Sequence, residues 1–522
     1  MARHTLRTRA VAAVTALAIA GGGSLLLAPP ASAGAAEVTV ATTNPFVNVS
    51  GTDQPIGSIG LTEVTAAGDV STSVCVEIIG AGATFDTASA LPTVTDNTDA
   101  VAGVVTRNTT QVSFPITTPG TAKTTFAIAG LVLDVGATAG QITAKVGKVC
   151  GGTDYEAVIN LAFAGTVDRI QGADRYATAV QIAENQFNCA GTGGKGSLND
   201  KTVVITRGDT FPDALSASFL AGKNDAPILL TAPTTLAPQT ETALRVNGIK
   251  SVVLIGGTVA LSAALETYID NLAIYDCAGA PLVGTMTVSR ITGPDRYATA
   301  QNVAESKGNA AAGSLDEGID GACGAVKTAI VASGENFPDA LAVGGLAYTG
   351  STGACGDGVP LPLLLTPKAT LSGAASGAIT NLAIKQVILL GGPDAIAAGV
   401  QTAIDNIAGV SVVRVSGATR QATAVEIANK LLGPAGVGGW NADGFLLSRP
   451  DTFPDALAAS ALSGRTESPI YLTDSTSALG ATATGGIASY PILYTHGTLL
   501  GGATALTDAV GTQAKAAIAA QT

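Results

Sequence analysis

The run Arg290-Ile-Thr-Gly-Pro-Asp-Arg-Tyr-Ala-Thr-Ala300 decides the fold, because the chain contains it three times. It is preceded by Arg169-Ile-Gln-Gly-Ala-Asp-Arg-Tyr-Ala-Thr-Ala179 and followed by a more divergent version, Arg414-Val-Ser-Gly-Ala-Thr-Arg-Gln-Ala-Thr-Ala424. A long block that recurs in this way is typical of an array of similar structural units.

Three further blocks follow the first one in the same order in every copy. They are Phe-Pro-Asp-Ala-Leu, a proline-led aliphatic run that ends in threonine, and an apolar run that closes in a glycine pair. Their positions are Phe211, Phe337 and Phe453 for the start of the first, 227–231, 362–366 and 469–473 for the second, and Gly256-Gly257, Gly391-Gly392 and Gly501-Gly502 for the glycine pairs. We therefore divide this part of the chain into copies at 166–284, 285–409 and 410–522.

The periodicity within the first copy predicts its fold. Short apolar runs at 202–206, 227–231 and 251–255 have the length and composition of buried strands, and we add Thr166–Ile170 as the first strand. Amphipathic stretches at 177–187, 213–221, 240–246 and 261–271 have helical spacing. This alternation of strands and helices requires crossover helices over a parallel sheet, so each copy is predicted to be an open α/β module.

The phenylalanine block is interpreted as the start of a helix. A capping residue stands three positions before an acid, which is the capping-box pattern with Asp in place of Glu. We favour this structural interpretation over a catalytic aspartate, although these acids follow strands at the edge where open α/β sheets receive ligands. The residues concerned are Thr210 with Asp213, Asn336 with Asp339, and Thr452 with Asp455.

An arginine recurs at the start of the first helix of each copy, as Arg175, Arg296 and Arg420. One interpretation is architectural, with a hydrogen bond or ion pair that locks the turn against a neighbouring strand or module. The other is an anion site, formed by the guanidinium and the helix N-terminus, for a phosphate or carboxylate group. We favour the first and keep the second as a candidate.

The N-terminal part of the chain differs from the copies. Residues 1–33 are typical of an export signal, with three arginines before an apolar run and the small triplet Ala31-Ser32-Ala33; a retained membrane anchor is the less favoured alternative. Residues 34–165 lack helical periodicity and predict about seven short strands in an immunoglobulin-like antiparallel sandwich. The candidate strands are 37–43, 58–64, 73–79, 111–116, 124–134, 141–150 and 155–164.

Charge and cysteine content limit the possible partners. Removal of three of the 27 basic residues with the signal leaves 24 against 39 acidic ones, a net charge of −15, which opposes general binding to nucleic acid or anionic membranes. An even number of cysteines in an exported chain favours disulfides over a metal cluster, since no CxxC is present and His496 is the only mature histidine. Pairing within domains gives Cys75 with Cys150, Cys189 with Cys277, and Cys323 with Cys355, one of 15 connectivities.

The four blocks resemble the cell wall binding repeat 2 (CWB2) family of Gram-positive surface proteins. The resemblance implies three flavodoxin-like or Toprim-like modules in a pseudo-threefold arrangement that holds noncovalently to an anionic wall polymer or a peptidoglycan-associated polysaccharide. It also implies a role in polymer retention for the aliphatic segments, which from the residues alone are buried strands. These segments are Ile228-Leu229-Leu230, Leu363-Leu364-Leu365 and Ile470-Tyr471-Leu472. The third copy departs from the pattern at Thr419, Gln421 and Tyr471, so a site is least expected there.

Three classes of function follow. We expect a secreted, non-enzymatic protein that is anchored to the cell wall, displays its N-terminal domain, and needs no cofactor or metal. The alternatives are an amidase-like peptidoglycan hydrolase, for which one histidine supplies neither zinc ligands nor a convincing triad, and an S-layer or adhesion component. Nucleotide binding ranks fourth, because neither a Walker loop nor GxGxxG follows a first strand.

Overall fold

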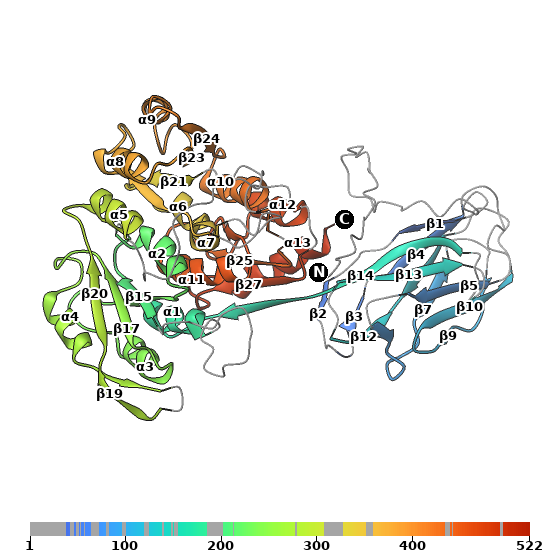
Figure 1. Ribbon diagram of the computed structural model, residues 1–522. Helices are drawn as coiled ribbons and strands as arrows, with labels where there is room; N and C mark the ends of the chain where they lie inside the picture. Colours follow the sequence, from blue (N-terminus) through green and yellow to red (C-terminus); the bar gives the residue numbers. More distant parts are fainter. Residues whose placement is uncertain are drawn as a thin grey trace, which may run out of the picture.

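The computed structural model describes most of residues 38–521 (Figure 1). Outside the description lie residues 1–37, 42–45, 49–51, 53, 57, 64–72, 80–82, 97–100, 119–124, 138–139, 148–149, 151–154, 185–201, 212, 277–278, 307–326, 351–358, 434–438, 441, 491–493 and 522. The predicted export signal and Cys189, Cys277, Cys323 and Cys355 therefore fall outside the described residues.

Each of the three copies contributes to a four-stranded parallel sheet, as the apolar runs predict. The order of strands is the same in all three sheets, with the strand after the first helix in second place. The first sheet is β16 (Ile228–Thr231), β15 (Thr202–Arg207), β17 (Ser251–Ile255) and β20 (Thr287–Ile291); the second is β22 (Leu363–Thr366), β21 (Thr328–Ser333), β23 (Gln386–Leu390) and β24 (Ser411–Val415); the third is β26 (Ile470–Leu472), β25 (Gly444–Ser448), β27 (His496–Leu500) and the end of β14 (Tyr155–Ile170).

The edge strand of each sheet comes from a neighbouring sequence copy, and here our prediction was wrong. We assigned Thr166–Ile170 to the sheet of the first copy, but it pairs in parallel with β27 of the third copy, in register from Thr166 with His496 to Ile170 with Leu500. The first sheet is completed instead by β20, and the second by β24. Periodicity identifies a strand but not its partner, so the exchange is invisible in the sequence. The division into copies remains a proposal about folding units.

Helices cover both faces of each sheet. The outer helices are α3 (Pro238–Val246) and α4 (Ala263–Asp270) in the first copy, α8 (Gly373–Asn381) and α9 (Ala398–Asp405) in the second, and α12 (Ala481–Ala488) and α13 (Asp508–Ala519) in the third. The first helix of each copy is α1 (Arg175–Glu184), α5 (Arg296–Glu305) or α10 (Arg420–Ile427). The helices of the Phe-Pro-Asp block are α2 (Ala217–Lys223), α6 (Pro338–Ala342) with α7 (Gly344–Thr349), and α11 (Pro454–Arg465).

The block helices α2, α7 and α11 pack together where the three copies meet (Figure 1). Small residues allow this close approach, because a Cβ on Gly222 would overlap the backbone carbonyl of Tyr348. At their C-terminal ends one polar cluster joins all three copies. Arg465 donates to the Oη of Tyr348 at 2.8 Å and to a carboxylate oxygen of Asp225 at 2.6 Å, and Tyr348 donates to the same oxygen at 3.1 Å.

The N-terminal region is β-rich, as predicted. One sheet has the order β1 (Val38–Ala41), β4 (Ile59–Glu63), β11 (Thr125–Ala129) and β7 (Thr93–Asp96), and faces β13 (Gly140–Gly147), β5 (Ser73–Ile78) and β10 (Gln111–Thr118) across one hydrophobic core. The predicted strand 124–134 is two strands, β11 and β12 (Val132–Val135), separated by Gly130 at a φ of 76°. An immunoglobulin-like topology stays a prediction.

A disulfide joins Cys75 to Cys150, with the Cα atoms 5.4 Å apart, so this predicted pairing is present. β14 then leaves the β-rich region and continues without interruption into the third parallel sheet (Figure 1). Within the described part of the chain, no helix has the length and hydropathy needed to span a membrane.

Candidate functional site

The first arginine of each copy fastens its strand to the glycine pair that follows the neighbouring strand of the same sheet. The Nη1 atoms of Arg169, Arg290 and Arg414 donate to the carbonyl oxygens of a glycine in the glycine pair, at 2.8, 2.7 and 2.6 Å. The acceptors are Gly501, Gly256 and Gly391, each at a positive φ. These contacts explain why the arginine and the glycine pair recur together.

The next residues of the block build the start of the first helix. Side-chain oxygens of Asp174, Asp295 and Thr419 accept hydrogen bonds from the backbone N–H three positions later, at 2.8, 2.8 and 3.1 Å. These residues are N-caps, and the Thr at 419 preserves the function of the Asp in the other copies. Sequence reasoning missed this role because we looked for the caps in the phenylalanine block.

The capping-box prediction in that block was wrong. Phe337 and Phe453 are the N-caps of α6 and α11, and neither helix start has a side-chain cap hydrogen bond. In the first copy Asp213 precedes a 3₁₀ turn, Ala214–Ser216, again without a side-chain cap. The carboxylates instead point at the glycine pairs, where a Cβ on Gly256, Gly391 or Gly501 would crowd the Oδ2 of Asp213, Asp339 or Asp455. Thr210, Asn336 and Thr452 therefore have no capping role.

The recurrent arginines lie at the seams between copies. The Nη1 atoms of Arg175, Arg296 and Arg420 donate to the carbonyl oxygens of Gly208, Gly334 and Pro450 at 2.6, 2.6 and 2.7 Å. Each arginine also interacts electrostatically with the block aspartate of another copy. The pairs are Arg296 with Asp213, Arg420 with Asp339, and Arg175 with Asp455. These electrostatic interactions thus run in a cycle through all three copies.

Burial dominates the electrostatics of these seam aspartates. Desolvation raises the pKa of Asp339 to about 6, although the Arg420 guanidinium and a hydrogen bond with Thr423 act in the opposite direction. Desolvation likewise raises the pKa of Asp213 and of Asp455 above the usual value, against the opposing effects of Arg296 and Arg175. The block aspartates are therefore largely buried at the seams, where they interact with the arginines of other copies.

The aromatic and aliphatic blocks are also internal. Phe211, Phe337 and Phe453 form a triangle with ring centroids 5.1, 6.1 and 6.1 Å apart, so one phenylalanine of each copy meets the other two. The nine residues of the aliphatic segments are at most 1% exposed. A direct contact of Ile228, Leu229, Leu230, Leu363, Leu364, Leu365, Ile470, Tyr471 or Leu472 with a polymer is incompatible with this burial, so any role in retention acts through folding.

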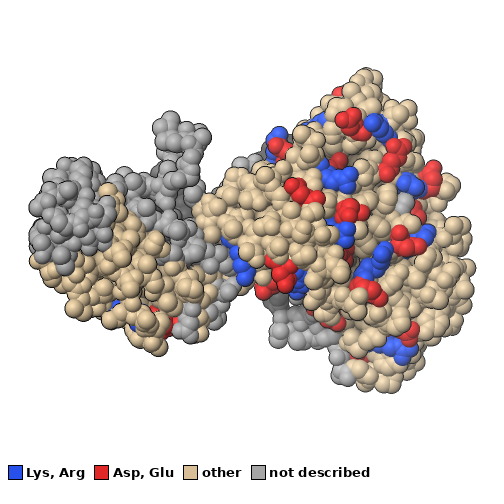
Figure 2. Space-filling model, turned by 180° about the vertical axis from the view of Figure 1, so that it is seen from behind, with Lys and Arg blue, Asp and Glu red and all other residues tan. Residues whose placement is uncertain are grey.

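The exposed surface of the α/β body carries interspersed charges. On the face seen in Figure 2, basic and acidic side chains alternate over the body, and the described part of the β-rich region shows few of either sign. Elsewhere in the α/β body, charges are also paired, as Arg207 is with Asp209 at 2.6 Å and Arg449 with Asp451 at 2.5 Å. This mixture provides no extended basic surface on that face for an acidic chain to use.

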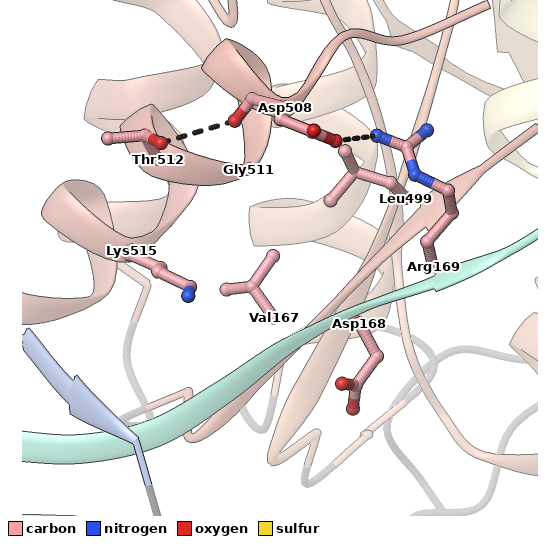
Figure 3. A pocket seen from close by; sticks show the side chains of 8 residues that line it. All are labelled: Val167, Asp168, Arg169, Leu499, Asp508, Gly511, Thr512 and Lys515. Atoms are coloured by element: carbon pink, nitrogen blue, oxygen red, sulfur yellow. Dashed lines mark hydrogen bonds and ion pairs between the residues drawn. The ribbon is translucent and has the colours of Figure 1, made fainter. Parts of the chain in front are cut away.

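A pocket of about 240 Å³ opens between β14 and α13 (Figure 3). Arg169 and Lys515 bring cationic groups to it, and Arg169 pairs with Asp508 at 3.0 Å. Val167 and Leu499 form an apolar floor beneath α13. The remaining lining residues are Asp168, Gly511 and Thr512. Sequence reasoning missed this place, because it joins the start of the first copy to the end of the third through the exchange of β14.

Comparisons with known proteins bear on the copies. The profile of the family described as cell wall binding domain 2 (CWB2) matches residues 169–266, 290–401 and 414–511. N-acetylmuramoyl-L-alanine amidase LytC of Bacillus subtilis is 28% identical over 309 residues, 59% of this chain and 50% of that protein. The amidase enhancer of Bacillus subtilis is 28% identical over 310 residues, 59% of this chain and 35% of that protein. The chain therefore spans half or less of these curated relatives.

Two solved structures share the fold. Cwp6 from Clostridium difficile superposes with a TM-score of 0.52 at 16% identity, covering 91% of this chain and 68% of that one. Cwp8 from Clostridium difficile gives a TM-score of 0.52 at 14% identity, covering 90% of this chain and 89% of that one.

Proposed function

The chain belongs to the cell wall binding domain 2 (CWB2) family, and we propose that it is a secreted surface protein that its three copies anchor noncovalently to a Gram-positive cell wall. The ligand we propose is an anionic wall polymer or a peptidoglycan-associated polysaccharide, with the N-terminal β-rich region on display. The observation that carries the proposal is the match of all three copies to a wall-binding family. The pseudo-threefold arrangement of flavodoxin-like or Toprim-like modules belongs to this proposal, and the cyclic seams support it.

The acidity of the chain restricts how an anionic polymer could be held. A protein with 39 acidic and 27 basic residues repels such a polymer at long range. Binding therefore requires local basic grooves or bridging divalent ions. Wall binding in the presence and absence of a chelator separates these two routes: loss of binding with the chelator would indicate bridging divalent ions, and unchanged binding would indicate basic grooves.

Sedimentation with purified cell walls tests the proposal. We expect residues 166–522 to pellet with walls and residues 34–165 to stay in solution. Walls from which mild acid has extracted the anionic polymers are expected to retain much less protein. Equal pelleting on extracted walls would exclude that polymer as the ligand, and failure of the 166–522 fragment to pellet would refute anchoring by the copies.

Peptidoglycan hydrolysis is the second candidate, because one relative is an amidase by name. The similarity covers half of that relative, and the family that matches this chain is described as binding. In the described residues, no group of three or more His, Cys, Asp or Glu side chains is arranged to hold a metal ion. Incubation of the purified chain with a wall suspension distinguishes the two functions: steady turbidity is expected of an anchor, and falling turbidity of a hydrolase.

An S-layer or adhesion component is the third candidate and differs from the first in lateral assembly. Light scattering at rising protein concentration, without walls, is expected to show no growth of particles for a simple anchor. Ordered sheets under these conditions would favour the lattice.

A further inference from the structure

A β-hairpin is inserted into the first copy, between its last helix and the edge strand of its sheet. The strands of the hairpin are β18 (Ala273–Tyr275) and β19 (Pro281–Thr285), and it projects from the body beyond α3 (Figure 1). The corresponding connection in the second copy, from α9 to β24, consists of residues 406–410 alone. The first family match ends at residue 266 and the second begins at residue 290. The hairpin is therefore an addition of this chain to the shared module.

Apolar side chains are exposed on the hairpin and on the two helices beside it. In β19, Val283 is 102% exposed and Leu282 is 37% exposed. Val246 at the end of α3 is 51% exposed, and Tyr268 of α4 is 48% exposed. These four residues, here called the hairpin patch, are four of the nine large apolar side chains that are exposed in the described residues. A concentration of this kind marks an interaction surface.

The patch is specific to the first copy. The last residue of the nine-residue helix α3 is Val246, and the last residue of its counterpart α8 is Asn381. The sixth residue of α4 is Tyr268, and the sixth residue of its counterpart α9 is Ala403. The first copy has thus gained apolar surface at places where the second copy has a polar or a small side chain.

A chain of polar contacts holds the three elements of the patch together. The Nη1 atom of Arg245 donates to the Oη of Tyr275 at 3.3 Å, and the guanidinium lies 5.6 Å from the centre of the same ring. The Nη2 atom of Arg245 donates to Oε1 of Glu241 at 2.7 Å. The Oη of Tyr268 donates to Oε2 of Glu241 at 2.9 Å. These contacts fix α4 and the hairpin to α3, so the patch is one ordered surface.

The shape of the hairpin explains the prominence of Val283. Three residues of β19, 282–284, lie opposite the single residue Ile274 of β18. Gly284 has a φ of 109°, which favours glycine, and the resulting bulge carries Val283 outward. In the described part of the chain, β19 pairs with β18 alone. Because a bulged edge hinders the pairing of a further strand, side chains make the contact with a partner here.

The hairpin patch and its polar chain carry no net charge. Arg245 and Glu241 neutralise each other, and β19 contains no ionisable side chain. An anionic polymer therefore gains no electrostatic attraction here, which separates the patch from the wall-binding function proposed above. Tyr and Arg beside aliphatic side chains are instead the composition typical of a protein interface.

We propose that the hairpin patch is the interface of a twofold dimer, in which a second copy of this chain covers it. The four side chains of the patch expose on the order of 400 Å². A stable interface buries roughly 800 Å² per partner, of which somewhat over half is apolar. The patch thus supplies most of the apolar area that each partner of a stable dimer needs.

A second copy of the chain suits the patch better than an unrelated protein. Twofold symmetry sets the same surface opposite itself, so Val283 of each copy packs beside Tyr268 of the other. The neutral pair of Arg245 and Glu241 meets the opposite charges of its equivalent. Away from the patch, the excess of 39 acidic over 27 basic residues opposes contact between copies. The patch occurs once in the described part of each chain, so association ends at two copies, whether or not the chain binds a wall.

Sedimentation velocity of the mature chain, residues 34–522, tests the dimer without any wall material. We expect a dimer at about 100 µM chain that dissociates to a monomer on dilution. The mass is expected to stop at twice that of the chain, in contrast to the continued growth of a lattice. A monomer at every concentration, or growth beyond two copies, would overturn the proposal.

Val283→Asp is the decisive variant, because it places a charge in the middle of the apolar contact. Val283 is fully exposed, so the substitution is expected to leave the melting temperature unchanged. The dissociation constant of the dimer should rise about tenfold or more. Val259→Asp is the matched control, since Val259 is 93% exposed in the same copy but follows β17, at the opposite end of the sheet from the hairpin. The second copy has Asp394 at this position, and we expect the control to dimerise like the native chain.

Tyr268→Ala, which introduces the residue of the second copy, provides an independent variant and should also weaken the dimer about tenfold or more. Amide hydrogen exchange then locates the contact. Exchange over residues 281–285 is expected to slow at concentrations that favour the dimer, and not to slow in Val283→Asp. A dimer that both patch variants leave intact would overturn the interface. Slower exchange over 281–285 on addition of cell walls, without any effect of chain concentration, would assign the patch to a wall component and refute the dimer.

Discussion

At the scale of single residues, the repeated blocks are the parts that join the copies. The arginine at the start of the first helix donates to a carbonyl oxygen of its own copy and interacts electrostatically with the block aspartate of another copy. Arg296 does so with Gly334 and Asp213. These pairs are partly buried, so each depends on its partner to offset the cost of desolvation. From the sequence alone, an anion site and such a seam cannot be told apart, because Arg and Asp occur together in both.

Arg296→Gln tests the architectural role. The substitution weakens a charged hydrogen bond, worth about 1.5–3 kcal/mol, and deprives Asp213 of its neighbouring cation. We expect a lower melting temperature and, through it, weaker wall binding. Lys430→Gln, at an exposed position, breaks an i,i+4 pair with Glu426 at 2.8 Å and should cost less than about 1 kcal/mol. Unchanged stability and unchanged wall affinity in Arg296→Gln would contradict both interpretations of the arginines.

The pH dependence of the free energy of unfolding should reveal the raised pKa of Asp339. Its pKa in the folded chain is about 6 instead of 3.8, so the folded state binds a proton more tightly than the unfolded state. The corresponding stabilisation is complete below about pH 4 and is lost as the pH rises through 6, and it amounts to at most roughly 3 kcal/mol. Between pH 7 and pH 5 the melting temperature of the native chain should rise more than that of Asp339→Asn. Parallel curves for the two proteins would contradict a raised pKa.

At the scale of elements, apolar runs predicted the strands of the first copy to within one or two residues. The predicted runs 202–206 and 251–255 correspond to β15 and β17, because buried parallel strands carry few polar residues. The predictions that failed were the sheet partner of residues 166–170 and the helix caps in the phenylalanine block. Strand partners depend on the path of the chain through space, and the orientation of Asp213 depends on a glycine pair some forty residues away. The cavity at Gly511 could not be predicted, since it requires knowing that β14 lies beneath α13.

The packing of α2 against α7 makes Gly222 irreplaceable. Gly222→Ala places a methyl group against the backbone of Tyr348, which cannot move without separating two copies. We expect a loss of about 1–3 kcal/mol or more, measured by denaturant unfolding. Gly485→Ala in α12 is the matched control, because a Cβ there has open space and should stabilise the helix by about 0.5–1 kcal/mol. Similar effects of the two substitutions would refute the close packing.

At the scale of the whole molecule, the chain closes a ring on itself. Each sheet borrows an edge strand from another copy, and the last sheet takes its edge from the strand that enters the first copy. Local sequence patterns describe the units of such a ring but not its closure. Closure also explains how three copies of similar sequence form one body around the phenylalanine triangle.

Truncation around residue 166 tests ring closure. A fragment of residues 166–522 keeps the five residues that pair with β27, whereas 171–522 lacks them and also the bond from Arg169 to Gly501. We expect the shorter fragment to melt several degrees lower and to be cut first by protease in the third copy. The same melting curve and cleavage pattern for both fragments would show that the exchanged strand contributes nothing.

The uninterrupted course of β14 has a mechanical consequence. A pulling force on the N-terminal region would be transmitted through the backbone of β14 into the third sheet, because no flexible linker separates the two parts of this strand. There it meets a parallel ladder running in register from Thr166 to Ile170, so that the load is a shear on many bonds at once and not an unzipping of one after another. A protein built in this way transmits a force on its N-terminal region directly into the α/β body, which we propose to be the part that binds the wall.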